Sequence, residues 1–166
     1  MEFKNSVSTN RVQYLRLCSL GLKKETADMS GCIFGGEQVF GSVSKHERKN
    51  PQLYENDKDW PAWSLGRLIE MCPKTIWMKN NEYTFLIDGE GCCGYYDDVD
   101  YEGMYIYFDR GDIFDNMILC IEWLINAGKF NKEYLMDCGY DYSLCVMDYE
   151  KKLIEDGSIR NMINGK

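Results

Sequence analysis

Apolar positions that recur at helical spacing predict two helices in the first half of the chain. Residues 8–20 open with side chains that can cap a helix and stop before Gly21, a residue type that readily takes the left-handed position after a helix. Residues 60–72 carry Pro61 just inside their start, where a missing amide proton costs nothing, and they end before Pro73. The apolar positions of this second helix are Trp63, Leu65, Leu68, Ile69 and Cys72.

The strongest helical pattern lies further along the chain. Asp112 is the predicted cap, Asp115 lies in the first turn, and Gly128 stops the helix. Its apolar stripe consists of Phe114, Met117, Ile118, Ile121 and Ile125. In the tail, the pattern predicts a short turn after Asn131 and a further helix near residues 143–156.

Alternating apolar and polar positions between residues 74 and 108 predict strands instead. The runs "TIWM" and "EYTFLID" flank "KNN", a polar turn whose asparagines tolerate positive φ, and together they predict a hairpin. Two further strands are predicted in "CCGYYDD" and "GMYIYF". The last of them places Met104, Ile106 and Phe108 on one face and Tyr105 and Tyr107 on the other.

Residues 23–59 show no lasting periodicity. Glycines, a charged run and Pro51 interrupt the pattern, so we expect mostly loop with one short helical turn. A length of 166 residues, 45% of them hydrophobic, suits a single domain spanning residues 1–166. The predicted fold class is α+β, in which helices from both ends cover one face of a small antiparallel sheet of three to four strands.

The formal net charge of -8 narrows the choice of partners. An acidic average field repels phosphate backbones and anionic lipid head groups, so nucleic acid and a membrane surface are unlikely partners. No segment approaches the roughly 18 consecutive apolar residues that a membrane span requires, and the start of the chain lacks an apolar leader. We therefore expect a soluble, cytoplasmic protein.

The sequence contains 8 cysteines and 1 histidine. Several cysteines sit inside apolar runs such as "MILCIEWL", where a thiol packs as a small hydrophobe. Without a signal peptide, we expect these thiols to be reduced. No Cys-x-x-Cys occurs and His46 has no cysteine within four residues, which argues against structural zinc.

The stretch "DVDYEGMYIYFD", residues 98–109, comes nearest to a chemical motif. Asp98, Asp100, Glu102, Gly103 and Asp109 occupy positions that a calcium-binding loop would use. The flanking residues do not have a helical pattern, and the last position lacks the bidentate reach of glutamate. The favoured interpretation is a turn that joins two strands.

Acidic residues around this stretch leave a second possibility. Paired carboxylates at strand ends hold the ion in many magnesium-dependent phosphoryl-transfer enzymes. A divalent-metal-dependent enzyme acting on a phosphorylated small molecule or nucleotide, with Asp98, Asp100 and Asp109 as metal ligands, is therefore the alternative function. No cluster of lysine or arginine lies nearby to hold a phosphate, and a solvated acidic edge that resists sheet pairing is the simpler interpretation.

Tyrosines interleaved with acids form the main candidate site, because tyrosine is enriched where proteins meet their partners. The candidate partner-binding residues are Tyr95, Tyr96, Asp97, Asp98, Asp100, Tyr101, Tyr105 and Tyr107. Such a face would bind a basic protein or imitate a nucleic acid. The tryptophans Trp60, Trp63 and Trp77 are most simply core, and a small-molecule pocket between them is a third hypothesis.

Three stretches, "LGLKKETADMS", "WPAWSLGRLIEMCPKTI" and "ILCIEWLINAGKF", resemble a family of short, uncharacterised proteins of Bacteroides-type gut bacteria and their mobile elements. In that family a leucine-glycine turn precedes "TADM", a Pro-x-Trp-Ser segment opens a helix, and a tryptophan-leucine helix ends near the C-terminus. The resemblance covers roughly residues 15–130 and carries no activity, ligand or catalytic residue. It implies a bacterial or phage cytoplasmic setting.

The leading hypothesis for function is a non-enzymatic protein-interaction module that uses the acidic, tyrosine-rich face and needs no cofactor. The resemblance adds a more specific expectation, namely an accessory or inhibitor protein of a mobile element. The expected partner is another protein.

Overall fold

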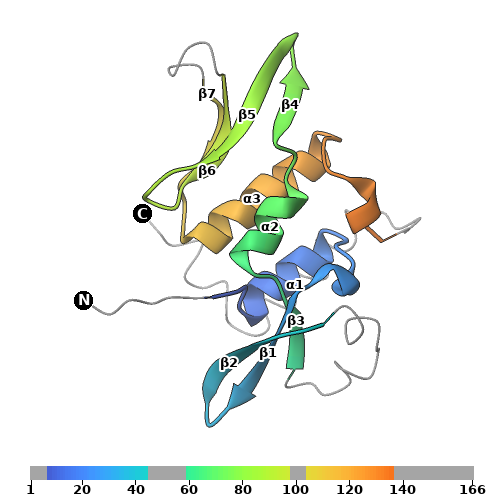
Figure 1. The fold of residues 1–166 in the computed structure, drawn as a ribbon, viewed down its shortest axis with the longest axis vertical. Coiled ribbons are helices and arrows are strands. Elements are labelled where there is room, and N and C mark those ends of the chain that lie inside the picture. Colours follow the sequence, from blue (N-terminus) through green and yellow to red (C-terminus); the bar gives the residue numbers. More distant parts are fainter. Residues whose placement is uncertain (1–6, 45–58, 98–103, 137–166) are drawn as a thin grey trace.

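The computed structural model describes residues 7–44, 59–97 and 104–136, which form two antiparallel sheets with helices between them (Figure 1). The three-stranded sheet consists, in spatial order, of β2 (Glu37–Ser42), β1 (Met29–Phe34) and β3 (Asp59–Ala62). The four-stranded sheet consists of β4 (Thr75–Met78), β5 (Asn81–Ile87), β6 (Cys93–Asp97) and β7 (Met104–Phe108). The α-helices are α1 (Arg11–Ser19), α2 (Leu65–Met71) and α3 (Ile113–Asn126). The α+β prediction is confirmed.

Helix α1 confirms the first predicted helix. The Asn10 side chain accepts a hydrogen bond from the Gln13 amide, and the Gln13 side chain accepts one from the Asn10 amide, so two amides of the first turn are satisfied reciprocally. Gly21, with φ of 86°, reverses the chain after the helix. The Leu22 amide then donates to the Leu17 carbonyl and closes the helix end.

The three-stranded sheet corrects the prediction of mostly loop for residues 23–44, and residues 45–58 of the predicted loop lie outside the described residues. Strands β1 and β2 form a regular hairpin whose register runs from Met29 opposite Ser42 to Phe34 opposite Glu37. Gly35 and Gly36 both have positive φ, at 61° and 89°, as the tight turn requires. The interruptions in the apolar pattern therefore marked a turn between two strands. The short helical turn expected in this segment is present as η1 (Lys24–Thr26).

Pro61 lies in β3 and not in a helix, which corrects the predicted start of the second helix. Strand β3 is an edge strand that pairs with β1 on one side, and an edge is where a residue without an amide proton is tolerated. Helix α2 begins only at Leu65, because the Ser64 side chain caps it by accepting from the Arg67 amide. The helix ends before Pro73, as expected.

The four-stranded sheet follows the predicted hairpins closely. Lys79 and Asn80, with φ of 49° and 72°, make the two-residue turn between β4 and β5. Strands β6 and β7 pair antiparallel, with a register shift between Tyr95 and Tyr96. Ile106 and Phe108 of β7 contact the core, as the alternating pattern predicted.

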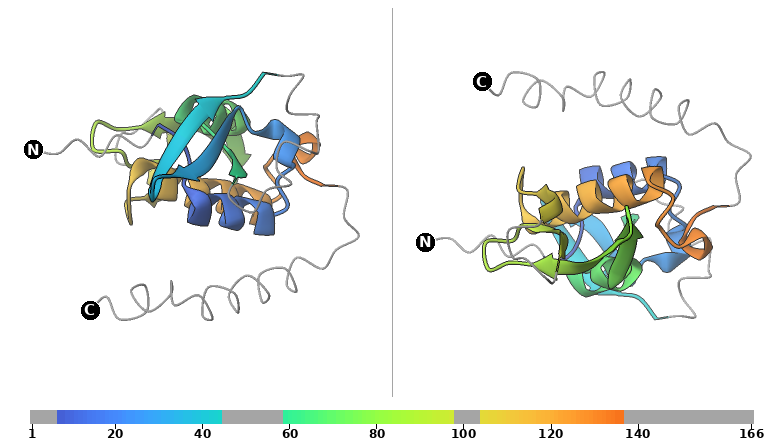
Figure 2. Two further views of the ribbon diagram at one scale, coloured as in Figure 1. Left: turned by 90° about the horizontal axis from the view of Figure 1, so that it is seen from below. Right: turned by 90° about the horizontal axis from the view of Figure 1, so that it is seen from above.

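Helix α3 lies against one face of this sheet, where it contacts β6 and β7 (Figure 2). Asp112 caps it by accepting from the Asp115 amide, and Gly128, with φ of 66°, follows its end. Both features agree with the sequence prediction. The predicted turn after Asn131 is present as η4 (Lys132–Tyr134).

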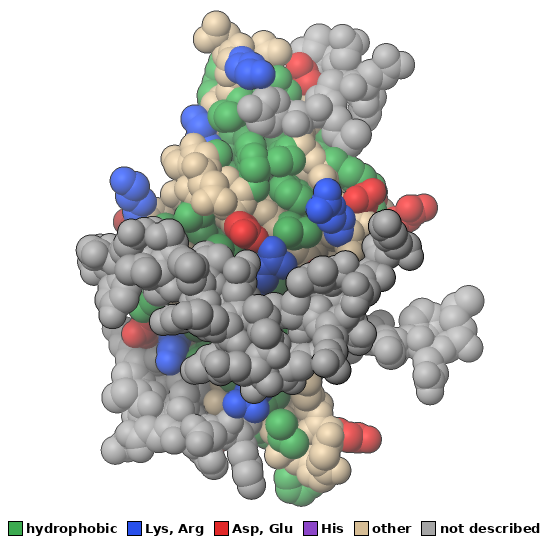
Figure 3. All heavy atoms as spheres, turned by 180° about the vertical axis from the view of Figure 1, so that it is seen from behind, with side chains coloured by type: hydrophobic (Ala, Val, Ile, Leu, Met, Phe, Trp, Pro, Cys, Tyr) green, Lys and Arg blue, Asp and Glu red, His purple; other side chains and the backbone are tan. Residues whose placement is uncertain are grey.

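One hydrophobic core joins the three α-helices to the four-stranded sheet, and partly buried apolar side chains surround it. Seen from behind, hydrophobic side chains gather over the upper part of the molecule, where α3 and this sheet lie (Figure 3). The core includes a cluster of thiols, in which Cys120 of α3 lies beside Cys72 at the end of α2 and Cys93 of β6. The contact with Cys120, followed by burial, raises the pKa of Cys93, and the contact with Cys72 together with burial raises the pKa of Cys120 against the opposing effect of Cys93, so both thiols keep their protons.

Helix α1 packs on α3 through polar contacts as well as through the core. The Gln13 side-chain amide donates to the Asp115 carboxylate at 2.8 Å, and Arg16 forms an ion pair with Glu122. The sequence predicted one sheet covered by helices from both ends of the chain. In the structure, α1 lies between α3 and the three-stranded sheet, where it contacts β3. The predicted helix near residues 143–156 lies outside the described residues.

None of the helices that the structure describes combines the length and the apolar composition needed to cross a bilayer.

Candidate interaction surface

The candidate site is the face of the four-stranded sheet that lies opposite α3, here called the outer face. The pairing of the strands defines it, because directly opposed residues of an antiparallel sheet point to the same side. Trp77 of β4 lies opposite Glu82 of β5, and Thr84 lies opposite Tyr96 of β6. The residues of the outer face are Thr75, Trp77, Glu82, Thr84, Leu86, Gly94, Tyr96 and Tyr107.

The two faces of this sheet differ sharply in exposure. On the side of α3, Ile76 and Tyr83 are buried and Tyr95 is 0% exposed. On the outer face, Trp77 is 61% exposed and Leu86 is 45% exposed. A tryptophan held by the backbone of a strand and left this open is unusual, because its ring usually buries a large area.

Two tyrosines extend the outer face across β6 and β7. The rings of Tyr96 and Tyr107 meet edge to face, with centroids 6.3 Å apart, and both side chains are half-buried. The Tyr107 hydroxyl donates to Oδ2 of Asp88 at 3.3 Å. Asp88 stands at the end of β5, where its other carboxylate oxygen accepts from the amides of Glu90 and Cys92.

These contacts set the charge state of the surface. The hydrogen bond from the Cys92 amide lowers the pKa of the Asp88 carboxyl, so that carboxyl stays ionised. A contact with the Cys92 side chain, followed by desolvation and the charge of Asp88, raises the pKa of Tyr107, and burial raises the pKa of Tyr96. At neutral pH this end of the outer face therefore offers two phenol hydroxyls and the fixed carboxylate of Asp88.

The structure separates the residues that the sequence grouped into one tyrosine-rich face. Tyr96 and Tyr107 lie on the outer face, but Tyr95 is buried, with its hydroxyl donating to the Pro73 carbonyl at 2.8 Å and its ring beside Phe85. Asp97 lies opposite Tyr83 and so shares the face of α3. Asp98, Asp100 and Tyr101 lie outside the described residues, and for Tyr105 only the backbone of β7 is described.

The acidic stretch 98–109 is flanked by strands. Strand β6 ends at Asp97, and β7 begins at Met104 and pairs with it, which is the arrangement that the favoured interpretation expects of the flanks. Of the three proposed metal ligands, only Asp109 is described, and it is exposed after β7. Within the described ranges no group of three or more His, Cys, Asp or Glu side chains could hold a metal ion.

The tryptophans do not surround a common pocket. Trp63 is buried in the core, where its Nε1 donates to Thr26 Oγ1 at 3.0 Å and its ring stacks on Tyr14. Trp60 is 1% exposed and belongs to the three-stranded sheet, with its ring edge to face with Phe40. Trp77 lies on the other sheet, exposed, so the expectation that it is a core residue is wrong.

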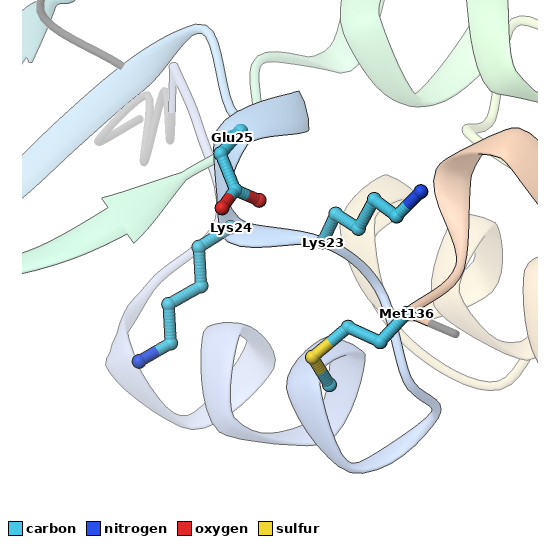
Figure 4. A pocket seen from close by; sticks show the side chains of 4 residues that line it. All are labelled: Lys23, Lys24, Glu25 and Met136. Atoms are coloured by element: carbon cyan, nitrogen blue, oxygen red, sulfur yellow. The ribbon is translucent and has the colours of Figure 1, made fainter. Parts of the chain in front are cut away.

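An open hollow of about 430 Å³ lies elsewhere, lined by Lys23, Lys24, Glu25 and Met136. Figure 4 shows that the two lysine side chains point in opposite directions, so their ammonium groups do not converge on one site. The Lys23 ammonium also donates to the Glu133 carbonyl at 3.0 Å. The hollow therefore lacks the arrangement that an anion would need.

Sequence reasoning missed Trp77 and Leu86. The available signal was the alternation of side chains along a strand, since successive residues point to opposite faces of the sheet. Trp77 follows the buried Ile76, and Leu86 lies between Phe85 and Ile87, which contact the core. This alternation alone does not say which face a helix will cover. That choice depends on where α3 returns in space.

No protein-family model, curated protein or solved structure matches this chain.

Proposed function

We propose that the chain is a protein-interaction module and that its contact surface is the outer face of the four-stranded sheet. The observation that carries the proposal is the exposure of Trp77, at 61%, on a strand of the same sheet face that carries Leu86, Tyr96 and Tyr107. Tryptophan and tyrosine are the residue types that most often dominate the binding energy of an interface. They bury much apolar area and lose little side-chain entropy on binding.

The charges along β5 describe the partner. Glu82 lies directly opposite Trp77 and Lys79 occupies the turn next to β4, whereas Asp88 and Glu90 stand at the other end of β5. A partner that inserts an apolar side chain beside Trp77 and places basic side chains along β5 would satisfy both features. The expected partner is thus a protein with an apolar anchor flanked by lysine or arginine.

The resemblance to a family of mobile-element proteins supports a narrower proposal, in which the module acts as an accessory or inhibitor protein of such an element. That part rests on the stretches around residues 20–30, 60–76 and 118–130 and not on the outer face. The partner would then be encoded by the same element or by its host.

The test is affinity capture with the tagged full chain from a lysate of its source, compared between the natural chain and the double variant Trp77→Ala, Leu86→Ala. We expect the captured protein to be lost in the variant, with affinity reduced at least about tenfold, because two exposed anchors are removed. The melting temperature should change little, since both side chains are already largely in water.

A matched control is Ile69→Ala, which removes a side chain 37% exposed on α2 that is not part of the outer face. This control should capture the partner as the natural chain does. Undiminished capture by the double variant would show that the outer face is not the contact surface.

A further inference from the structure

The described sheets have four edge strands, and three of them carry a feature that hinders pairing with another strand. Strand β3 contains Pro61, which cannot donate a ladder hydrogen bond. Strand β4 is only 4 residues long and is flanked by Lys74 and Lys79. The pairing of β7 with β6 is irregular at Tyr96. Proline, short length, lysine and bulges are the usual means by which proteins prevent edge-to-edge association.

Strand β2 has none of these features. It is 6 residues long, contains no proline, lysine or arginine, and pairs with β1 in an unbroken register. Five of its six residues are exposed, and Glu37, next to the turn, is its single charged side chain. In the part of the chain that the structure describes, the hydrogen-bonding partner of β2 is β1 alone, so half of its backbone donors and acceptors face outward.

We propose that β2 pairs antiparallel with β2 of a second copy of this chain, which joins the two three-stranded sheets into one sheet of six strands. This surface is distinct from the outer face and lies at the other end of the molecule (Figure 1). The backbone groups along β2 supply the ladder, and the apolar side chains of the hairpin supply the contact area.

Self-pairing fits the charge pattern of the strand. A two-fold axis at Val39, one of the two central residues of β2, brings Val39 next to Val39 of the copy, and it places each Glu37 side chain opposite Gly41 of the copy, so the two carboxylates lie at opposite ends of the shared ladder. A parallel arrangement would instead set these carboxylates side by side. The antiparallel pair therefore has no like charges opposed along β2.

The exposed side chains of the hairpin support the same pairing. Val39, which is 45% exposed, lies opposite Cys32 of β1, and Phe34, which is 78% exposed, lies on the same face two residues further on. The two-fold axis keeps equivalent faces together, so Cys32 and Val39 of both copies form one row across the joined sheet. Burial of Val39 in this row adds hydrophobic stabilisation to the backbone ladder.

Sedimentation equilibrium of the full chain over a range of concentrations tests the proposal. We expect a weak, concentration-dependent rise of the average mass from 19.4 kDa toward twice that value. The variant Val39→Lys should weaken association at least about tenfold, because it opposes two like charges at the axis. A protein that stays monomeric at every concentration would overturn the proposal.

A pair of variants with opposite charges at Val39 distinguishes a loss of dimerisation from a loss of folding. The variants Val39→Lys and Val39→Glu should each be monomeric, and their mixture should recover the dimer. The matched control Trp77→Lys adds the same charge at an exposed strand position of the outer face and should leave the dimer intact. A dimer that Trp77→Lys dissociates and Val39→Lys does not would assign self-association to the outer face and would refute pairing through β2.

Hydrogen exchange distinguishes a second copy from a segment of the same chain. Amides along β2 that face away from β1 should gain protection as the concentration rises. Protection that is already complete in dilute monomer would mean that another part of the same chain covers the edge, and the proposal would fail.

Discussion

The two sheets of this protein differ in how much of their structure the core supports. The four-stranded sheet has α3 on one face and contributes Tyr95 and Cys93 to the core, both 0% exposed. The three-stranded sheet extends away from that core, and five residues of β2 are exposed. Stability of the fold therefore depends chiefly on the four-stranded sheet. The three-stranded sheet instead presents backbone groups and side chains of β2 to the solvent.

Each sheet contains one glycine that permits a close approach, and the two glycines meet different neighbours. A Cβ atom on Gly94 of β6 would collide with the backbone carbonyl oxygen of Ile106 in β7. A Cβ atom on Gly31 of β1 would collide with the indole ring of Trp60 in β3. A backbone oxygen held in a sheet cannot move aside, but a side chain can adjust at a cost.

The largest effect is expected for Gly94→Ala. The new methyl group forces β6 and β7 apart under α3, so we expect a loss of roughly 3 kcal/mol in the free energy of unfolding. Urea denaturation followed by circular dichroism measures it. The matched control is Gly89→Ala, where nothing lies within 4 Å. Equal stability of the two variants would contradict the difference drawn between these positions.

A smaller effect is expected for Gly31→Ala. The ring of Trp60 has to shift within the three-stranded sheet, at a cost of about 1–2 kcal/mol, while the four-stranded sheet stays intact. Tryptophan fluorescence and near-ultraviolet circular dichroism report the shift of the ring. Gly41→Ala serves as the control, because its nearest neighbour, Ser30 Oγ, is 4.0 Å away. A loss as large as that of Gly94→Ala would show that the two sheets share their stability.

A still smaller effect concerns acid sensitivity of the four-stranded sheet. Hydrogen bonds from backbone amides, that of Cys92 first, lower the pKa of Asp88 in the folded chain. The ionised carboxylate thus stabilises the fold above its unfolded pKa of about 3.9, and this contribution is lost as pH falls through the lower folded pKa. Asp88→Asn should reduce the dependence of the melting temperature on pH below about 4.

The matched control for Asp88→Asn is Glu90→Gln, which neutralises the neighbouring exposed side chain in the same turn. The control should keep the pH dependence of the natural chain. An identical slope for both variants would mean that Asp88 does not anchor the end of β5.

No effect is expected from magnesium. A metal site at Asp98, Asp100 and Asp109 would bind the folded chain and raise its melting temperature by mass action, and Asp98→Asn would abolish the rise. We expect the interaction module to melt at the same temperature with magnesium and with a chelator. A rise that depends on Asp98 would favour the metal-dependent enzyme over the interaction module.

Sequence reasoning succeeded where each local signal pointed to one structure. The turn at Lys79 and Asn80, the alternation over Ile106–Phe108 of β7 and the capping of α3 by Asp112 all combine local propensity with a matching apolar period. Each of these features depends on residues close together in the chain. The helix ends at Gly21 and Gly128 were predictable for the same reason.

The three-stranded sheet escaped prediction because its signals are short and its last strand is distant. Gly35 and Gly36 between apolar runs do indicate a hairpin, yet charged and glycine-rich neighbours obscured it. Strand β3 comes from a segment that also fits a helix start, since Pro61 suits both a first helical turn and an edge strand. The outer face could not be chosen in advance, because the packing of α3 decides it.

The thiol cluster of Cys72, Cys93 and Cys120 provides a chemical probe of local unfolding between α3 and β6. The thiolate, and not the thiol, attacks an alkylating reagent, and burial together with contacts inside the cluster keeps Cys93 and Cys120 protonated and enclosed. Alkylation of these two thiols therefore requires that α3 separate from β6. The alkylation rate then measures the frequency of this local opening in the folded chain. Cys32, half-exposed on the hairpin, supplies a reactive reference within the same molecule.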